Sequence, residues 1–111
     1  MKKVNTVKAH ADFDRIIHHG RSIKSPRFSV YFVPSDLDYA RIGISVGKKN
    51  GIAVRRVLIK RQVRAIVAKA DLLDLKMDII IAVRPTYDPV EYGESEQELL
   101  ASLTRVKETI H

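Results

Sequence analysis

The chain lacks the residues on which several kinds of functional site depend. It contains no cysteine, which excludes disulfides, thiolate metal sites and cysteine nucleophiles and fits a protein of the reducing cytoplasm. Long apolar runs are missing as well: the first eight residues lack the apolar core of a signal peptide, and no stretch approaches the roughly 20 apolar residues that span a bilayer. Acidic residues are a minority, since 13 Asp and Glu stand against 20 Lys and Arg.

The remaining composition describes a small basic protein. A length of 111 residues with 45% hydrophobic residues predicts one domain, residues 1–111, around a single core. A net charge of +7 and a pI near 9.9 are typical of proteins that act on RNA, DNA or an anionic membrane surface. An ordinary globular protein with a basic surface is the alternative that composition leaves open.

The first three quarters of the chain has the pattern of a helix, several strands and a second helix. Phe13 and Ile16 recur at helical spacing between His10 and His19, and Gly20 is a typical helix stop. Three strands are predicted at 27–33, 41–47 and 77–83, with a further short strand possible at 21–24. A long helix is predicted from about 51 to 70, with a sheet-facing stripe of Ile52, Ile59, Val63, Ile66 and Ala70.

A final amphipathic helix completes the predicted fold. Ser95 and Glu98, three residues apart, have the spacing of a capping box, and apolar residues then repeat every three or four positions from Leu99. This order of elements describes a compact α+β domain of two layers.

The long helix and the turn before it carry seven of the chain's 20 cations within 20 consecutive residues. Arg56, Lys60 and Arg64 stack along one flank, with Arg61 beyond them, and no acidic residue occurs between positions 38 and 71 to pair with them. A row of cations repels itself unless a polyanion neutralises it, and a phosphate backbone is the usual polyanion. The helix therefore predicts a nucleic-acid partner rather than a merely solvated face.

Three apolar side chains of this helix, Val54, Val57 and Leu58, point away from the predicted core. Two interpretations remain open at this stage. These side chains pack beneath a neighbouring segment such as the N-terminal residues, or they form an apolar gap inside the binding surface.

No catalytic site is found in the chain itself. His18 and His19 are consecutive on a helix and cannot face one target together. No glycine-rich phosphate loop is present. The acidic residues have structural explanations, namely capping and solubility for Asp71, Asp74 and Asp78, and the dipole of the last helix for Glu91, Glu94, Glu96 and Glu98. Any enzymatic activity is therefore expected to depend on a partner.

Several segments, in this order and spacing, resemble the protein component of bacterial ribonuclease P over roughly residues 1 to 85. They are Phe13 followed by Gly20, Phe28-Ser29-Val30-Tyr31, Arg41-Ile42-Gly43-Ile44-Ser45-Val46-Gly47-Lys48-Lys49, Gly51-Ile52-Ala53-Val54, and Ile59-Lys60-Arg61 with Arg64. The resemblance implies a small two-layer α+β fold, similar to domain 2 of ribosomal protein S5, in the order α-β-β-β-α-β-α. It also implies a left-handed βαβ crossover, which the general handedness rule disfavours.

The resemblance further implies a function and a set of contacts. Such a protein binds a large catalytic RNA and the 5′ leader of precursor tRNA, while the RNA cleaves the leader with its own Mg²⁺; no catalytic residue, cofactor or metal ligand belongs to the protein. Contacts with RNA phosphates are implied for Lys48, Lys49, Arg55, Arg56, Lys60, Arg61 and Arg64. A cleft for the single-stranded leader is implied at Phe13, Ile17, Arg27, Ser29 and Tyr31. Phe13 has a second interpretation as a core residue.

The chain departs from the family pattern at the start of the long helix. The family usually has Gly-Asn-Ala-Val where this chain has Gly51-Ile52-Ala53-Val54, and Arg-Asn-Arg where it has Arg56-Val57-Leu58. An aromatic residue expected in the first helix is replaced by Ile17. Two alternatives to a ribonuclease P subunit follow: a diverged RNA-binding or chaperone protein of the same fold, and a protein-interaction module that uses the apolar side chains.

Overall fold

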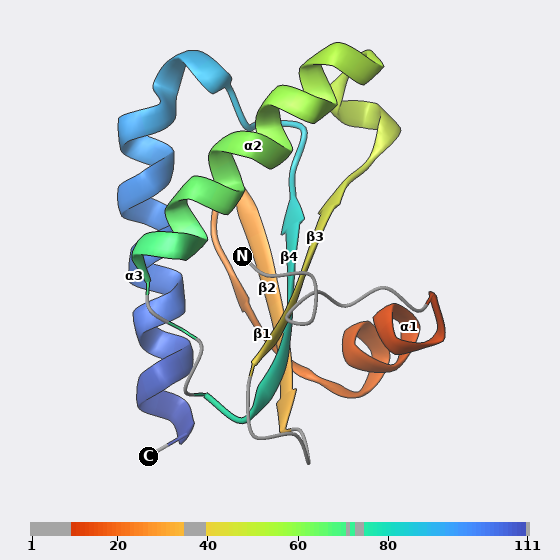
Figure 1. Ribbon diagram of the computed structural model, residues 1–111, viewed down its shortest axis with the longest axis vertical. Helices are drawn as coiled ribbons and strands as arrows, with labels where there is room; N and C mark the ends of the chain where they lie inside the picture. Colours follow the sequence, from red (N-terminus) through yellow and green to blue (C-terminus); the bar gives the residue numbers. More distant parts are fainter. Residues whose placement is uncertain (1–9, 35–39, 71, 73–74, 111) are drawn as a thin grey trace.

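The computed structural model describes residues 10–34, 40–70, 72 and 75–110 and, for residues 10–13 and 110, the backbone only (Figure 1). Three helices, four strands and two short 3₁₀ turns make up these residues. They are α1 (His10–His19), β1 (Arg21–Lys24), β2 (Phe28–Pro34), β3 (Arg41–Val46), η2 (Lys48–Asn50), α2 (Ala53–Lys69), β4 (Met77–Val83), η3 (Pro89–Glu91) and α3 (Tyr92–Ile110). The predictions for residues 10–19, 21–24 and 77–83 are confirmed residue by residue.

The four strands form one sheet in the order β1-β2-β4-β3. β2 pairs antiparallel with β1 and β4, whereas β3 and β4 are parallel neighbours and so require a crossover, which α2 provides. In Figure 1 α2 passes in front of the sheet, and β4 lies to the left of β3 with both strands pointing upward. The crossover is therefore left-handed, as the resemblance implies and against the usual rule.

The main core lies between the sheet and the layer formed by α2 and α3. Alternate residues of β2, namely Phe28, Val30 and Phe32, are buried on this face together with Ile59 and Val63 of α2. On the opposite face α1 covers only part of the sheet, where Ile16 packs with Val33 and Ile80. β4 is buried on both faces because it is a central strand with helices on either side, which explains its continuous apolar sequence.

Two predicted helix starts are wrong. The long helix begins at Ala53, not Gly51, because Ile52 has an extended backbone; its side chain is 75% exposed and is not part of the sheet-facing stripe. The last helix begins at Tyr92, continuing from η3, whose N-cap is the Asp88 carboxylate that accepts a hydrogen bond from the Val90 amide. Ser95 lies inside the helix and is fully buried, so the predicted capping box does not form.

The glutamates at the start of α3 bind cations of other elements and do not serve only the helix dipole. Glu91, Glu94 and Glu98 all contact the Arg27 guanidinium, at 3.1, 3.1 and 2.9 Å respectively. Glu98 also accepts hydrogen bonds from the Ser25 hydroxyl and the Arg27 amide. These bonds attach the turn between β1 and β2 to α3 and thereby fix the angle between the helix and the sheet.

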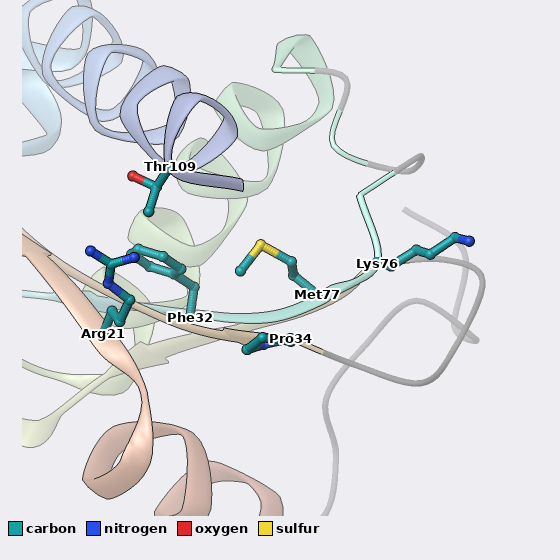
Figure 2. Close-up of a pocket in the computed structure, with 6 residues that line it drawn as sticks. All are labelled: Arg21, Phe32, Pro34, Lys76, Met77 and Thr109. Atoms are coloured by element: carbon teal, nitrogen blue, oxygen red, sulfur yellow. The ribbon is translucent and has the colours of Figure 1, made fainter. Parts of the chain in front are cut away.

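A pocket of about 270 Å³ lies between the C-terminal end of α3 and the nearby ends of β1, β2 and β4 (Figure 2). Phe32 and Met77 point from the sheet toward the helix, and Thr109 points from the helix toward them. The pocket opens on the α3 side of the sheet and belongs to neither of the predicted RNA-binding surfaces. Within the described part of the chain, no helix has the length and apolar character needed to cross a membrane.

Candidate RNA interface

The two flanks of α2 differ in how their polar side chains are used. On the flank toward α3, the Arg55 guanidinium donates to the carbonyl oxygens of Asn50 and Tyr87 at 3.0 and 3.3 Å. Further along this flank, Gln62 donates to the Pro89 carbonyl, and Lys69 pairs with Glu96 at 2.9 Å. These bonds attach α2 to η3 and α3.

The opposite flank carries Arg56, Lys60 and Arg64, called the cation row from here on. Their spacing of four residues places them one above another along the helix. Among the residues that the structure describes, none of the three has an ion-pair partner, and α2 itself contains no acidic residue. Arg61 is exposed next to the row. The predicted separation of α2 into a buried stripe and a cationic flank is therefore present, with Ile59, Val63, Ile66 and Val67 buried.

Two further cations precede α2. Lys48 and Lys49 are exposed in η2, and this turn is held by the buried Asn50, whose amide donates to the Val83 and Gly47 carbonyls at 3.2 and 3.3 Å. Gly51 follows with a φ of 110°, a left-handed conformation that side chains rarely adopt. The turn places both lysines at the N-terminal end of α2.

Among the seven predicted phosphate contacts, Arg55 thus differs from the other six. Its guanidinium already donates to two backbone carbonyls within the chain, which holds it beside η3. Lys48, Lys49, Arg56, Lys60, Arg61 and Arg64 have no such bonds among the described residues and lie on η2 and α2.

The second predicted site lies on the sheet face that α1 partly covers, called the cleft face below. Strand register places Tyr31, Ile80 and Gly43 in one row across this face, and Ser29, Ala82 and Ser45 in the next. Tyr31 is half-buried and packs against the apolar contact between α1 and the sheet. The next row carries only small side chains, of which Ser29 is buried and Ala82 and Ser45 are half-buried.

Arg84 is a cation of the cleft face that the sequence analysis missed. Its guanidinium donates to the Ser29 hydroxyl at 3.1 Å, and its amide donates to the Arg27 carbonyl. Arg84 directly follows β4. Because it lies outside the strand, the alternation of side chains along the strand does not predict which face of the sheet its side chain joins. The pairing of β2 with β4 brings Arg84 to Ser29, from which it is 55 residues away in sequence.

The other predicted cleft residues are placed differently from one another. Ile17 lies on α1 and is 37% exposed. Phe13 also lies on α1, but its side chain is outside the described part of the structure. Arg27 is separated from Ser29 and Tyr31, because its guanidinium is held by glutamates of α3 on the other side of the sheet.

The position of α1 over the cleft face depends on a buried carboxylate. Asp78 of β4 is 1% exposed and accepts hydrogen bonds from Arg41 of β3, at 2.9 and 2.7 Å, and from Arg15 of α1, at 2.8 Å. The assignment of Asp78 to capping and solubility is therefore wrong: it joins α1 to the sheet. Asp71 and Asp74 lie outside the described residues.

A close contact at the end of α1 supports the same arrangement. A Cβ on Gly20 would lie 2.4 Å from the Ile16 carbonyl oxygen and 2.9 Å from that of Phe32, so only glycine fits between α1 and β2. The amide of Gly20 donates to the Ile16 carbonyl and closes the helix, as the predicted helix stop requires.

The electrostatics of the buried carboxylates follow from their partners. Burial by itself would raise the pKa of Asp78, but the hydrogen bonds and charges of Arg41 and Arg15 outweigh it and hold the pKa below its ordinary value. Burial opposes ionisation of Glu98 in the same way, and bonds from Ser25 and Arg27 lower its pKa overall. Both carboxylates are already paired with cations of the chain, and in the described part of the molecule no three His, Cys, Asp or Glu side chains cluster as metal ligands would.

Comparison with known proteins agrees with this architecture. The family model for ribonuclease P matches residues 1–107. A ribonuclease P protein component from Streptococcus pyogenes is 35% identical over 99 residues, which cover 89% of this chain and 83% of the relative.

Solved structures of the same family have the same fold. The ribonuclease P protein of Staphylococcus aureus superposes with a TM-score of 0.79 at 34% identity, covering 95% of this chain and 97% of the other. For the Thermotoga maritima protein the TM-score is 0.77 at 30% identity, covering 90% and 96%. The chain therefore belongs to the ribonuclease P protein family and is the protein component of this ribonucleoprotein endoribonuclease, the partner of its RNA subunit.

Proposed function

We propose that this protein binds the catalytic RNA of ribonuclease P through the cation row and η2, and receives the 5′ leader of precursor tRNA on the cleft face. The observation that carries the proposal is the cation row itself, whose charges have no acidic partner among the described residues. RNA phosphates remove the mutual repulsion of these cations, and the release of counterions from the RNA favours binding. The protein then assists the 5′ maturation of tRNA in the cytoplasm by holding enzyme and substrate together.

The cleft face has the features that a single-stranded leader requires. The ring of Tyr31 offers a face on which a base can stack with little sequence preference. The next row across the sheet carries only the small side chains of Ser29, Ala82 and Ser45, and Arg84 supplies a positive charge for a phosphate at the end of that row. The cleft face and the cation row lie on different elements, so leader and catalytic RNA can be bound together.

Magnesium is assigned in this proposal to the RNA partner. The carboxylates of Asp78 and Glu98 are both paired with arginines, and the described residues include no group of three or more His, Asp or Glu side chains placed to hold a metal ion. The protein's own contribution is to add positive charge near the RNA and to position the leader. Hydrolysis is the work of the RNA.

The direct test is the cleavage rate of a leader-bearing precursor tRNA by a bacterial ribonuclease P RNA at low Mg²⁺, with and without the protein. We expect a clear acceleration, since the protein supplies cations that the RNA otherwise takes from Mg²⁺. Binding to the RNA without any acceleration would reject the proposed role and favour a diverged RNA-binding or chaperone protein. Similar affinity for unrelated structured RNAs would identify that alternative.

Replacing Tyr31 with alanine tests the leader site. Loss of one stacked base costs about 1–3 kcal/mol, so we expect the holoenzyme to bind precursor tRNA about 5- to 150-fold more weakly. The affinity for mature tRNA, which has no leader, should stay the same. The measurement is the Kd of both tRNAs, with Tyr31→Phe as the matched control that keeps the ring; an equal loss for both tRNAs would rule out leader stacking.

A further inference from the structure

The N-terminal part of α2 carries a concentration of exposed apolar side chains. Val54, Val57 and Leu58 are 76%, 66% and 42% exposed, and Ile52, just before the helix, is 75% exposed. Because Val57 and Leu58 lie three and four residues after Val54, the three form one continuous surface, called the apolar patch from here on. Six large hydrophobic residues are exposed in the described part of the chain, and four of them lie within the seven residues 52–58. A cluster of this kind marks an interaction surface.

We propose that the apolar patch packs against unpaired nucleobases of the catalytic RNA; this inference rests on the proposed function and identifies what part of the RNA α2 contacts. The charges around the patch select the partner. Lys60 and Arg61 follow Val57 by three and four residues, so each apolar side chain has a cation within one helical turn. No acidic residue occurs in α2 to offset them. The partner must therefore be apolar where it meets the patch and anionic around it.

Unpaired RNA satisfies both requirements. The faces of nucleobases are flat and weakly polar, and each base is joined to a phosphate that can reach a cation beside the patch. Within a duplex these faces are covered by stacking on neighbouring bases, and the surface that remains is mainly phosphate and ribose. A helix that contacted only duplex phosphates would gain nothing from Val54, Val57 and Leu58, whereas loops and bulges present bases that these side chains can cover.

A second copy of the chain fits this surface less well. Two patches in contact would bring Lys60, Arg61 and Arg64 of both copies together, with no acidic side chain of α2 on either side to neutralise them. The opposition of like charges disfavours such a dimer. The same argument excludes any cationic protein surface as the partner.

The test is the variant Val54→Ser/Val57→Ser/Leu58→Ser in the full chain, which removes apolar surface and leaves every charge in place. We expect its affinity for a bacterial ribonuclease P RNA to fall at least about tenfold, with the dependence of log Kd on log salt concentration unchanged, because no phosphate contact is lost. Unpaired adenines and cytosines that the unaltered protein protects from dimethyl sulfate should become reactive again. Ala65→Ser/Ala68→Ser, at exposed positions further along α2, is the matched control and should bind as the unaltered protein does.

Other results separate this inference from the proposed function. Unchanged affinity and unchanged base protection in the triple variant would overturn the inference while RNA binding itself stands. If the unaltered protein did not bind the RNA at all, the proposed function would fail first. A dimer of the unaltered protein that the variant dissolves would assign the patch to a second copy. A melting temperature lowered by more than a few degrees in the single variant Val57→Ser would show that the patch is packed inside the chain, and this too would overturn the inference.

Discussion

Replacing Lys60 and Arg64 together with glutamine is expected to weaken binding to the catalytic RNA at least about 100-fold. A charge-assisted hydrogen bond contributes about 1.5–3 kcal/mol, and two such contacts are lost. The slope of log Kd against log salt concentration should fall by about 2, because each phosphate contact releases roughly one counterion. Both side chains lie on the flank of α2 that faces away from α3, so the fold should be unaffected. Filter binding between about 50 and 200 mM salt measures both quantities.

The matched control removes the same number of charges elsewhere. Lys69 is paired with Glu96 on the other flank of α2, and Arg105 is exposed on α3. The variant Lys69→Gln/Arg105→Gln should lower affinity only slightly, through the change in net charge. If it weakened binding as much as the Lys60 and Arg64 variant, general attraction between a basic protein and RNA would explain the affinity, and the cation row would have no special role.

The largest loss of stability is expected from Asp78→Asn. Each arginine loses a charge-assisted hydrogen bond, worth about 1.5–3 kcal/mol, although the part-exposed guanidiniums of Arg15 and Arg41 regain some of this from water. Arg41 and Arg15 both bind this carboxylate, so one substitution weakens the side-chain contacts of β3 and of α1 with β4 together, while the backbone pairing of β3 and β4 remains. Urea unfolding at neutral pH measures the free energy of unfolding. Glu96→Gln, which breaks an exposed pair, is the control and should shift the midpoint little.

The same carboxylate predicts a dependence of stability on pH. Because the pKa of Asp78 is lower in the folded protein than in the unfolded chain, its contribution is fully present above the unfolded value of about 3.9 and is lost as the pH falls through the folded pKa. The difference in stability between the unaltered protein and Asp78→Asn should therefore be constant from pH 7 to about 5 and shrink below about pH 4. Urea midpoints at several pH values test this, and a difference that grew in acid would contradict it.

Local sequence predicted most of the fold because its signals act over short distances. The continuous apolar run of β4 indicates a buried strand, which the structure confirms. The alternation in β2 predicts one open face, but Ser29 and Val33 on that face are buried. The cationic flank of α2 was also readable, since the helical repeat fixes which side chains share a face. The family resemblance supplied the left-handed crossover, which no local pattern encodes.

Two of the errors share a physical cause, which is pairing between residues far apart in sequence. Ser95 and Glu98 have the spacing of a capping box, but Glu98 binds Ser25 and Arg27, more than 70 residues earlier. Asp78 is predicted to serve capping and solubility because its true partners, Arg15 and Arg41, are 63 and 37 residues away. Ion pairs of this kind are formed by the tertiary structure, so no local pattern announces them.

The order of the strands has a consequence for how the protein is made. β4 lies at the centre of the sheet and is the last strand in the chain. Until Val83 has left the ribosome, the β1–β2 hairpin and β3 have no common neighbour, and the apolar stripe of α2 has only an incomplete sheet to cover. The basic helix α2, which we propose binds RNA, is thus synthesised before β4, the strand against which the sheet is completed. The complete sheet can therefore form only after β4 has been synthesised, and until then the apolar stripe of α2 has no finished sheet to pack against.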